Sequence, residues 1–209
     1  MPNLSTFMIS VDSRINERAK TLPQFIDIGL LPEIVLPIMP PSSISNTEQF
    51  IRALRSAVWR KHDVLLIEDD IDINQESFVK WLNKAINPND AVTFCMLRRA
   101  SVDPKILQAI QECKTVKPEF YITKELSKWY GTQCVYIPYL LAKRIYEYGI
   151  PDGWDNSFDV LLRTRLTEWQ LRLLHCASDP VQHRAPPSVV NSLRKPLQSV
   201  TYGLGVDWQ

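Results

Sequence analysis

The apolar run VLLI at residues 64–67 ends directly in acidic residues, and this junction constrains the fold of the chain most strongly. A short, continuous apolar run is typical of a strand that is buried on both faces of a covered sheet. Glu68, Asp69 and Asp70 follow it at once, and Asp72 comes next but one. These four carboxylates repel one another, so they need solvent, a cation or other partners.

Predicted helices and strands alternate around this junction. Apolar residues at helical spacing predict an amphipathic helix over residues 46–60, with Ser45 as its N-cap and Glu48 completing a capping box. Further helices are predicted over residues 14–25, 78–86, 138–148 and 156–166, and strands over residues 6–11, 32–41, 91–97, 132–137 and 170–174. The alternation indicates an α/β fold, with a mostly parallel sheet and helices on both faces.

The length of 209 residues fits a single domain, residues 1–209, that is large enough to bury a real core. Residues 179–209 are rich in proline, serine and basic residues, so we expect an irregular C-terminal segment. The net charge of +1 argues against a generally basic nucleic-acid binder.

The compartment is predicted from the cysteines and from the absence of membrane signals. The cysteines form no CxxC pair, which favours reduced thiols over a zinc module or a disulfide scaffold. The first residues show no signal peptide, and Glu33 and several prolines interrupt the apolar segment at residues 28–41, so we expect no membrane span. A cytoplasmic protein is expected, in the host cytoplasm if the chain is virus-encoded.

The acidic cluster has three interpretations. Ligands of open α/β sheets bind beyond the carboxyl ends of the strands, where carboxylates suit Mg²⁺ or Mn²⁺ together with the phosphates of a substrate. Alternatively, the acids cap the next helix and face solvent. The third interpretation is a phosphatase or nucleotidyltransferase, because Asp70-Ile71-Asp72 matches the DxD motif of haloacid-dehalogenase-like phosphatases. That family carries the motif on its first strand, whereas a long stretch of chain precedes it here.

Several segments resemble, in order, the metal-dependent GT-A glycosyltransferases. LLIEDDIDI resembles the LEDD form of their DxD motif, especially in the lipopolysaccharide-type family (glycosyltransferase family 25), which also includes collagen galactosyltransferases. MISVDSRINERAKTL resembles the opening strand and the arginine-bearing nucleotide-sugar segment of that family. GTQCVYIPYLLAKRIYE resembles its glycine loop, strand and helix, PDGWDNSFDVLL its acidic acceptor-side motif, and SDPVQHR its late histidine loop.

The resemblance implies a metal site for Mn²⁺ or Mg²⁺ with Asp70 and His183 as ligands. For His183, a structural or solvated residue is the alternative to a metal ligand. The resemblance implies a single GT-A-like (Rossmann-like) domain around this site. The resemblance also implies a site for a nucleotide-diphosphate sugar, with Glu68 contacting the ribose or the water shell of the metal. The expected donor-binding residues are Ser10, Val11, Arg14, Arg18, Glu68, Asp69 and Gly131. Solvated helix charges are the alternative for the two arginines.

The acceptor side is predicted from the segment GWDNSFD. Sugar transfer with inversion needs a base for the proton of the acceptor hydroxyl, and Asp155 and Asp159 are the candidates. Asp155 is preferred because it lies at a loop-to-helix junction, and helix N-capping is the alternative role for it. Asp159 has Arg163 one helical turn away and could pair with it instead. The aromatic residues expected to stack on a sugar are Trp129, Tyr130 and Trp154, for which burial in the core is the alternative.

Together these features predict an inverting, metal-dependent hexosyl- or pentosyltransferase that moves a sugar from a nucleotide-diphosphate sugar to an acceptor hydroxyl. The acceptor is either a saccharide or a hydroxymethylated base in DNA. The DNA acceptor depends on a locally basic end, formed by Arg163, Arg165, Arg172, Arg184, Arg194 and Lys195, for which a solvated surface is the alternative. A non-catalytic sugar- or nucleotide-binding domain is the remaining hypothesis.

Overall fold

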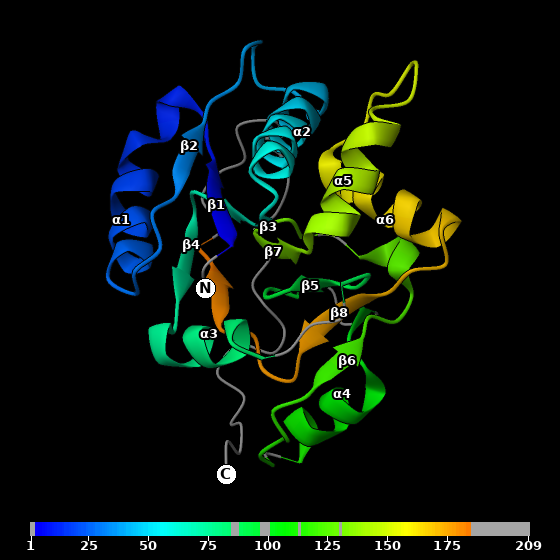
Figure 1. Ribbon diagram of the computed structural model, residues 1–209. Coiled ribbons are helices and arrows are strands. Elements are labelled where there is room, and N and C mark those ends of the chain that lie inside the picture. Colours follow the sequence, from blue (N-terminus) through cyan, green and yellow to red (C-terminus); the bar gives the residue numbers. More distant parts are fainter. Residues whose placement is uncertain (1–2, 85–87, 97–100, 113, 130, 185–209) are drawn as a thin grey trace.

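The computed structural model describes residues 3–84, 88–96, 101–112, 114–129 and 131–184. A seven-stranded sheet forms its centre, in the order β2-β1-β3-β7-β5-β8-β6 (Figure 1). The strands are β1 (Leu4–Ile9), β2 (Glu33–Val35), β3 (Asp63–Glu68), β5 (Ala91–Thr93), β6 (Phe120–Ile122), β7 (Cys134–Ile137) and β8 (Leu173–Cys176). β7 and β6 pair antiparallel with their neighbours and run against the other five strands. The predicted mostly parallel sheet is therefore confirmed.

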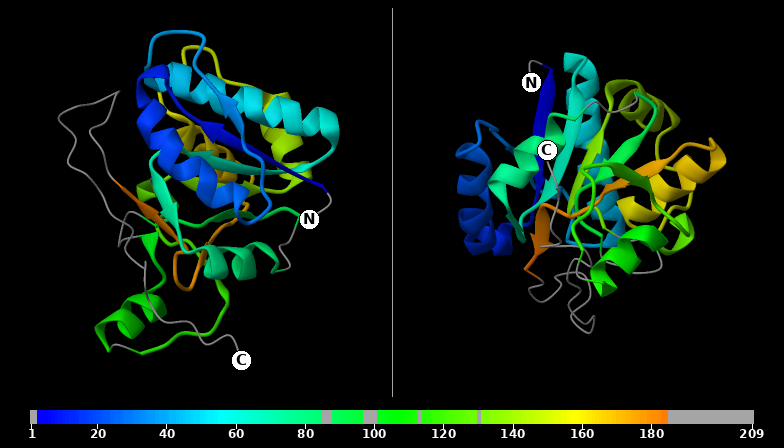
Figure 2. Two further views of the ribbon diagram at one scale, coloured as in Figure 1. Left: turned by 90° about the vertical axis from the view of Figure 1, so that its left-hand side faces the viewer. Right: turned by 90° about the horizontal axis from the view of Figure 1, so that it is seen from below.

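Helices cover both faces of this sheet, as predicted (Figures 1 and 2). The helices are α1 (Ile15–Ile26), α2 (Ser43–Arg60), α3 (Gln75–Leu82), α4 (Pro104–Gln111), α5 (Tyr139–Tyr148) and α6 (Phe158–Glu168), with 3₁₀ turns η1 (Asp12–Arg14) and η3 (Leu126–Lys128). α2 packs with α5 and α6 on one side, where the rings of Phe50 and Phe158 stack with centroids 4.5 Å apart. On the other side, Phe25 of α1 meets the ring of Phe78 of α3 edge-on at 5.6 Å.

Strand β3 lies at the centre of the core. All four side chains of residues 64–67 are fully buried, which confirms the interpretation of this run as a strand covered on both faces. Full burial of an aliphatic side chain of this size contributes about 1.5–3 kcal/mol, so β3 is anchored firmly. The half-buried Glu68 ends the strand, so the anchored strand fixes the position of the acidic residues at the edge of the core.

The start of α2 differs from the prediction. The helix begins at Ser43 with Ser42 as its N-cap, and the Ser42 hydroxyl accepts a hydrogen bond from the Ser45 amide at 3.1 Å. The Ser45 hydroxyl accepts one in return from the Ser42 amide at 2.7 Å. The predicted capping box of Ser45 and Glu48 is therefore wrong, because an earlier Ser-x-x-Ser pair already satisfies the first amides of the helix.

A second, two-stranded sheet was not predicted. β4 (Ile71–Ile73) pairs antiparallel with β9 (Val181–His183), and Ile71 lies opposite His183. β9 falls within residues 179–209, the segment that was expected to be irregular, whereas residues 185–209 lie outside the described residues. This β4–β9 ribbon places the late histidine beside the acidic cluster.

Other boundaries also differ from the predictions. α3 ends at Leu82, β5 stops at Thr93, and β8 covers residues 173–176 rather than 170–174. α4 and β6 were not predicted; Asp103 caps α4 by accepting a hydrogen bond from the Lys105 amide at 2.9 Å. Within the described residues, no helix has both the length and the apolar character that a bilayer crossing requires. Cys95, Cys134 and Cys176 are free and buried, and Cys113 lies outside the described residues.

Candidate functional site

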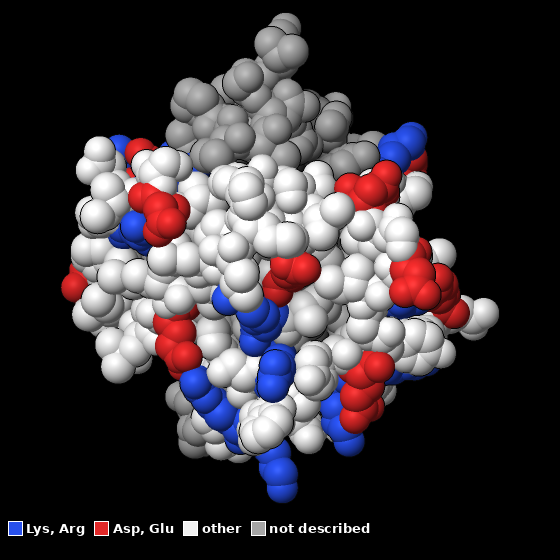
Figure 3. All heavy atoms as spheres, turned by 90° about the horizontal axis from the view of Figure 1, so that it is seen from above, with Lys and Arg blue, Asp and Glu red and all other residues white. Residues whose placement is uncertain are grey.

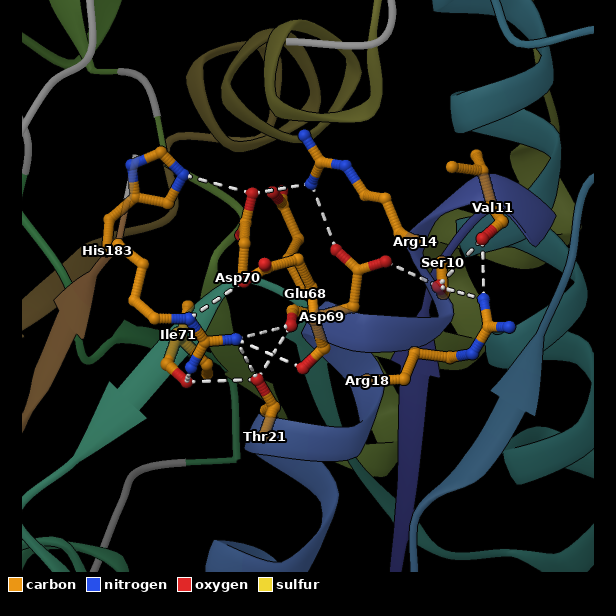
Figure 4. A network of polar contacts seen from close by, with 12 residues as sticks. Ser10, Val11, Arg14, Arg18, Thr21, Glu68, Asp69, Asp70, Ile71 and His183 are labelled. Carbon is orange, nitrogen blue, oxygen red and sulfur yellow. Dashed lines mark hydrogen bonds and ion pairs between the residues drawn. The ribbon is translucent and has the colours of Figure 1, made fainter. Parts of the chain in front are cut away.

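The acidic residues after β3 meet His183 at the carboxyl end of the sheet (Figure 4). β3 ends at Glu68. The next two residues, Asp69 and Asp70, form a turn, and β4 then pairs with β9. This pairing brings Nε2 of His183 to 3.3 Å from Oδ2 of Asp70. The two residues that were predicted to hold a metal are thus neighbours in space, although more than half of the chain separates them in sequence.

Asp69 is held by the end of β1 and the start of α1. The Ser10 hydroxyl donates a short hydrogen bond to Oδ2 of Asp69, and Nη1 of Arg14 donates to Oδ1 at 3.0 Å. Nη1 of Arg18 in turn donates to the Ser10 hydroxyl at 2.8 Å and to the Val11 carbonyl at 2.5 Å. Burial raises the pKa of Asp69, and these hydrogen bonds oppose that rise. All four residues predicted on this segment therefore gather at the acidic cluster.

Asp70 is a buried carboxylate with partners on only one of its two oxygens among the described residues. Its side chain is almost fully buried, and no described residue forms a hydrogen bond with its Oδ1 atom, which is costly for a buried carboxylate. Nη1 of Arg14 lies 2.6 Å from the other oxygen, Oδ2, which also faces His183. Burial pushes the pKa of Asp70 upward, but His183 and Arg14 hold it below its ordinary value. Asp70 is thus ionised, with one oxygen still unsatisfied.

Glu68 lies in a different environment from its neighbours. The Thr132 hydroxyl donates to Oε1 of Glu68 at 2.7 Å, next to Gly131, whose backbone has a φ of +145° that favours glycine. Burial and the nearby charge of Asp70 raise the pKa of Glu68 to about 7, against the effect of the Thr132 hydrogen bond. Glu68 thus exchanges a proton near neutral pH, and the Gly131-Thr132 segment lies beside it.

The residues at this edge fit a divalent cation that is completed by a ligand. Within the described ranges, no group of three or more His, Cys, Asp or Glu side chains is arranged to hold a metal ion by itself. The Asp70–His183 separation of 3.3 Å does suit neighbouring ligands of an octahedral ion, which lie roughly 3 Å apart when the bonds are about 2.1 Å. Mg²⁺ and Mn²⁺ sites commonly use one or two protein ligands and complete their shell with phosphate oxygens. The pair therefore fits a site shared between protein and substrate.

Arg184 organises the whole edge, and sequence reasoning assigned it only to a basic surface. Its guanidinium donates to the Asp69 carbonyl at 2.9 Å, to the Thr21 hydroxyl at 2.6 Å and to Oδ1 of Asp72 at 2.6 Å. It also forms an ion pair with Glu17 at 3.0 Å, and its amide donates to the Asp70 carbonyl at 2.8 Å. Arg184 therefore ties β9 and α1 to the acidic turn. Its position directly after the candidate ligand His183 was the only sequence signal.

Asp155 and Asp159 lie apart from this network. Asp155 is exposed, and its carboxylate accepts a hydrogen bond from the neighbouring Asn156 side chain at 2.6 Å. Asp159 is mostly buried in the first turn of α6 and accepts a hydrogen bond from the Ser157 hydroxyl. The Asn156 carbonyl accepts from the Thr47 hydroxyl of α2 at 2.7 Å, so this loop packs on the start of α2. In the part of the chain that is described, neither carboxylate contacts Asp70 or His183.

The three predicted stacking residues have different surroundings. Trp129 is fully buried in the hydrophobic core, which corrects the expectation of an exposed sugar platform. A large ring that follows η3 stabilises the fold more by burial than by facing solvent. Trp154 is half-buried and packs against the core, and Tyr130 lies outside the described residues.

Comparison with known proteins bears on the fold. No protein-family model and no curated protein matches the sequence, so the resemblance to the lipopolysaccharide-type family stays a prediction. Among solved structures, the chain is similar to a mutant of the Drosophila β-1,4-galactosyltransferase 7 in complex with manganese, UDP-Gal and xylobiose. The TM-score is 0.51 at 7% sequence identity, and the match covers 94% of this chain and 71% of that chain. The inositol-1-phosphate CTP transferase from T. maritima matches less well, with a TM-score of 0.42, 10% identity, and coverage of 82% and 66%, and carries no weight. The protein therefore has a GT-A-like fold, with its acidic turn at the carboxyl edge of the sheet.

Proposed function

We propose that this protein is a metal-dependent glycosyltransferase that moves a sugar from a nucleotide-diphosphate sugar to an acceptor hydroxyl. One observation carries the proposal: Asp70 is buried, its Oδ1 atom has no hydrogen-bond partner in the described part of the chain, and its Oδ2 atom faces His183 at 3.3 Å at the carboxyl edge of a GT-A-like fold. The galactosyltransferase of similar fold was solved with manganese and UDP-Gal, which supports the same ligand class here. Asp70 and His183 are the proposed ligands of Mn²⁺ or Mg²⁺.

The residues that we propose to bind the donor lie around the same turn. Arg14 ends η1 and Arg18 lies in the first turn of α1, whereas Glu68 ends β3 and Asp69 follows it in the turn. Figure 3 looks onto the face on which β1 and β2 end, and basic side chains gather near its middle beside acidic ones. We assign the two guanidiniums to the diphosphate of the donor. We assign Glu68 to the ribose, where its carboxylate accepts a hydrogen bond from a ribose hydroxyl.

The chemistry requires charge stabilisation and a base. When bound, the divalent cation neutralises the negative charge that builds on the diphosphate leaving group, an effect of several kcal/mol. As the acceptor oxygen bonds to the anomeric carbon and the bond to the diphosphate breaks, the hydroxyl proton passes to a carboxylate. We assign this role to Asp155, the exposed acid, with inversion of configuration, and keep Asp159 as the second candidate. Such a base contributes roughly 10²–10⁴-fold in rate.

A saccharide is the favoured acceptor over a modified base in DNA, because the described arginines of the basic end are engaged within the protein. Arg165 pairs with Glu168 at 2.9 Å, Arg172 pairs with Asp90 at 2.6 Å, and Arg184 is tied to Glu17. Arg194 and Lys195 lie outside the described residues. A gel shift with duplex DNA that contains hydroxymethylated cytosine separates the two acceptors, since binding that weakens steeply with salt indicates a DNA substrate.

The decisive experiment combines ligand binding with one substitution. A thermal-shift panel of nucleotide sugars, with and without Mn²⁺, should show one donor that stabilises the protein only when Mn²⁺ is present. Asp70→Asn should abolish this stabilisation and the release of nucleoside diphosphate, while circular dichroism shows an intact fold. Asp72→Asn is the matched control, because Asp72 is half exposed and pairs with Arg184. Full turnover in Asp70→Asn would refute the assignment.

A nucleotidyltransferase is the second candidate, because it also pairs carboxylates with a metal and a nucleotide. The products distinguish the two reactions: nucleotidyl transfer from a nucleoside triphosphate releases pyrophosphate, whereas sugar transfer releases a nucleoside diphosphate. A phosphatase would use Asp70 as a nucleophile with Asp72 beside it. In the structure, Asp72 is instead held by Gln24 and Arg184, at 3.0 Å and 2.6 Å from its Oδ1 atom.

A further inference from the structure

We propose that Arg14 is an internal counter-ion of the cation site: it neutralises Asp70 in the metal-free protein and must leave that carboxylate when the divalent cation binds. This inference rests on the proposed function, because it takes Asp70 as a metal ligand. It adds a link between metal loading and donor binding, since the guanidinium that the cation displaces becomes available to the diphosphate.

The contacts of Arg14 place it in competition with a cation. Its Nη1 atom lies 2.6 Å from Oδ2 of Asp70, the same oxygen that His183 faces at 3.3 Å. The Asp70 side chain is 3% exposed and that of Arg14 is 17% exposed. The guanidinium thus lies at the same carboxylate oxygen that faces His183, and a cation that binds between Asp70 and His183 meets a positive charge at bonding distance.

The same arginine has a second partner that makes a switch possible. Nη1 of Arg14 also lies 3.0 Å from Oδ1 of Asp69, whose other oxygen accepts from Ser10. Arg14 sits at the junction of η1 and α1, where its amide donates to the Val11 carbonyl at 3.0 Å. The backbone can therefore stay fixed while the side chain keeps Asp69 and releases Asp70. No rearrangement of α1 is needed.

The positive charge of Arg14 should lower the affinity of the site for a divalent cation. Two positive charges on one carboxylate repel each other, so Arg14 weakens the binding of Mn²⁺ in the absence of donor. Once the diphosphate is present, it offers Arg14 a new anionic partner, so donor and cation bind cooperatively. Coupling between two sites of this kind is typically 5–150-fold in affinity.

The test is a titration of MnCl₂ without nucleotide, with free Mn²⁺ followed by electron paramagnetic resonance. Arg14→Gln removes the charge but keeps a hydrogen-bond donor, and it should bind Mn²⁺ roughly tenfold more tightly than the wild type. Arg14→Lys keeps the charge and should bind as weakly as the wild type. Arg60→Gln is the matched control, because Arg60 pairs with Glu33 at the start of β2 rather than with Asp70, and its affinity should stay within about twofold.

The outcomes separate this inference from the proposed function. Equal or weaker Mn²⁺ binding in Arg14→Gln overturns the counter-ion role, and the metal site itself still stands if Asp70→Asn abolishes binding. Mn²⁺ binding to none of the variants overturns the metal site and the counter-ion role together. If Arg14→Gln is unfolded without metal, its melting temperature is measured against Mn²⁺ concentration. Rescue by Mn²⁺ supports the inference, and lack of rescue contradicts it.

Discussion

At the scale of single residues, the repulsion among the acids is relieved because each one has its own set of partners. Asp69 is bound by Ser10 and Arg14, Asp70 by Arg14 and His183, and Asp72 by Arg184 and Gln24. Glu68 instead holds a proton up to near-neutral pH. A cluster that looks uniform in sequence therefore consists of groups with different charge states.

The first prediction concerns the protonation of Glu68. Its folded-state pKa of about 7 lies above the ordinary value of 4.5, so ionisation disfavours the folded state. The contribution of Glu68 to stability is present below about pH 4.5 and is lost as the pH rises through about 7. The free energy of unfolding of Glu68→Gln, relative to that of the metal-free wild type, should therefore increase with rising pH by on the order of 1–3 kcal/mol. Urea unfolding at pH 5 and pH 8 measures this, and a pH-independent difference would contradict it.

At the scale of elements, the β4–β9 ribbon and the start of α1 carry the site. β4 follows the acidic turn directly, β9 delivers His183, and Arg184 fastens both to α1. Side chains on short strands are poorly placed unless neighbouring contacts hold them. Arg184 is thus a positioning residue for the candidate site, because it donates hydrogen bonds to the backbone carbonyls of Asp69 and Asp70.

The second prediction follows from this role. Arg184→Met should lower the free energy of unfolding by about 3–5 kcal/mol, because it leaves buried acceptors without a partner. It should also weaken Mn²⁺ binding, because His183 loses its fixed position. Arg184→Lys keeps the charge but cannot form the same fork of hydrogen bonds, so it should restore only part of both losses. Unchanged Mn²⁺ affinity in a folded Arg184→Met protein would show that Arg184 serves stability alone.

The third prediction concerns the start of α2. Ser42→Ala should destabilise the protein by about 1 kcal/mol, since Ser42 is the N-cap and accepts from the Ser45 amide. Glu48→Ala is the control, and it should change stability by less than about 0.5 kcal/mol because Glu48 is not part of the capping box. Chemical denaturation of the two variants measures both values. The reverse order would restore the capping box that the sequence suggested.

At the scale of the whole molecule, the acceptor side depends on how α6 packs on α2. The Asn46 side chain accepts from the Phe158 amide at 3.4 Å, and the Thr47 hydroxyl donates to the Asn156 carbonyl at 2.7 Å. α2 also reaches the acidic side of the sheet, because the Gln49 side chain donates to the Ser10 carbonyl at 2.7 Å. The start of α2 therefore lies between the loop that bears Asp155 and the residues around Asp69.

The fourth prediction compares the two candidate bases. Asp155→Asn should reduce kcat by roughly 10²–10⁴-fold with little change in stability, because this carboxylate is exposed. Asp159→Asn should mainly lower stability, because Asp159 is buried and accepts from Ser157. Steady-state kinetics together with thermal unfolding of both variants separate the two effects. A greater loss of kcat in Asp159→Asn would exchange their roles.

Local signals sufficed for much of the fold and for part of the site. The apolar run at residues 64–67 and the helical spacing at residues 46–60 predicted β3 and α2, because burial periodicity is written in neighbouring residues. They missed α4, although Ile106, Leu107 and Ile110 lie at helical spacing, and they missed β4, which spans only three residues. Similarly, the resemblance drew attention to Arg14, Asp70 and His183, and the structure brings these three together.

The sequence by itself determined the buried strand, its acidic end and the alternation of helices and strands, since each depends on residues close together in the chain. Only the tertiary structure decided which carboxylate keeps an unsatisfied oxygen, which one holds a proton, and that Arg184 fastens the site. The physical reason is that these properties depend on burial and on pairings such as Ile71 with His183, which join distant parts of the chain. Such pairings form only when the whole core closes around β3.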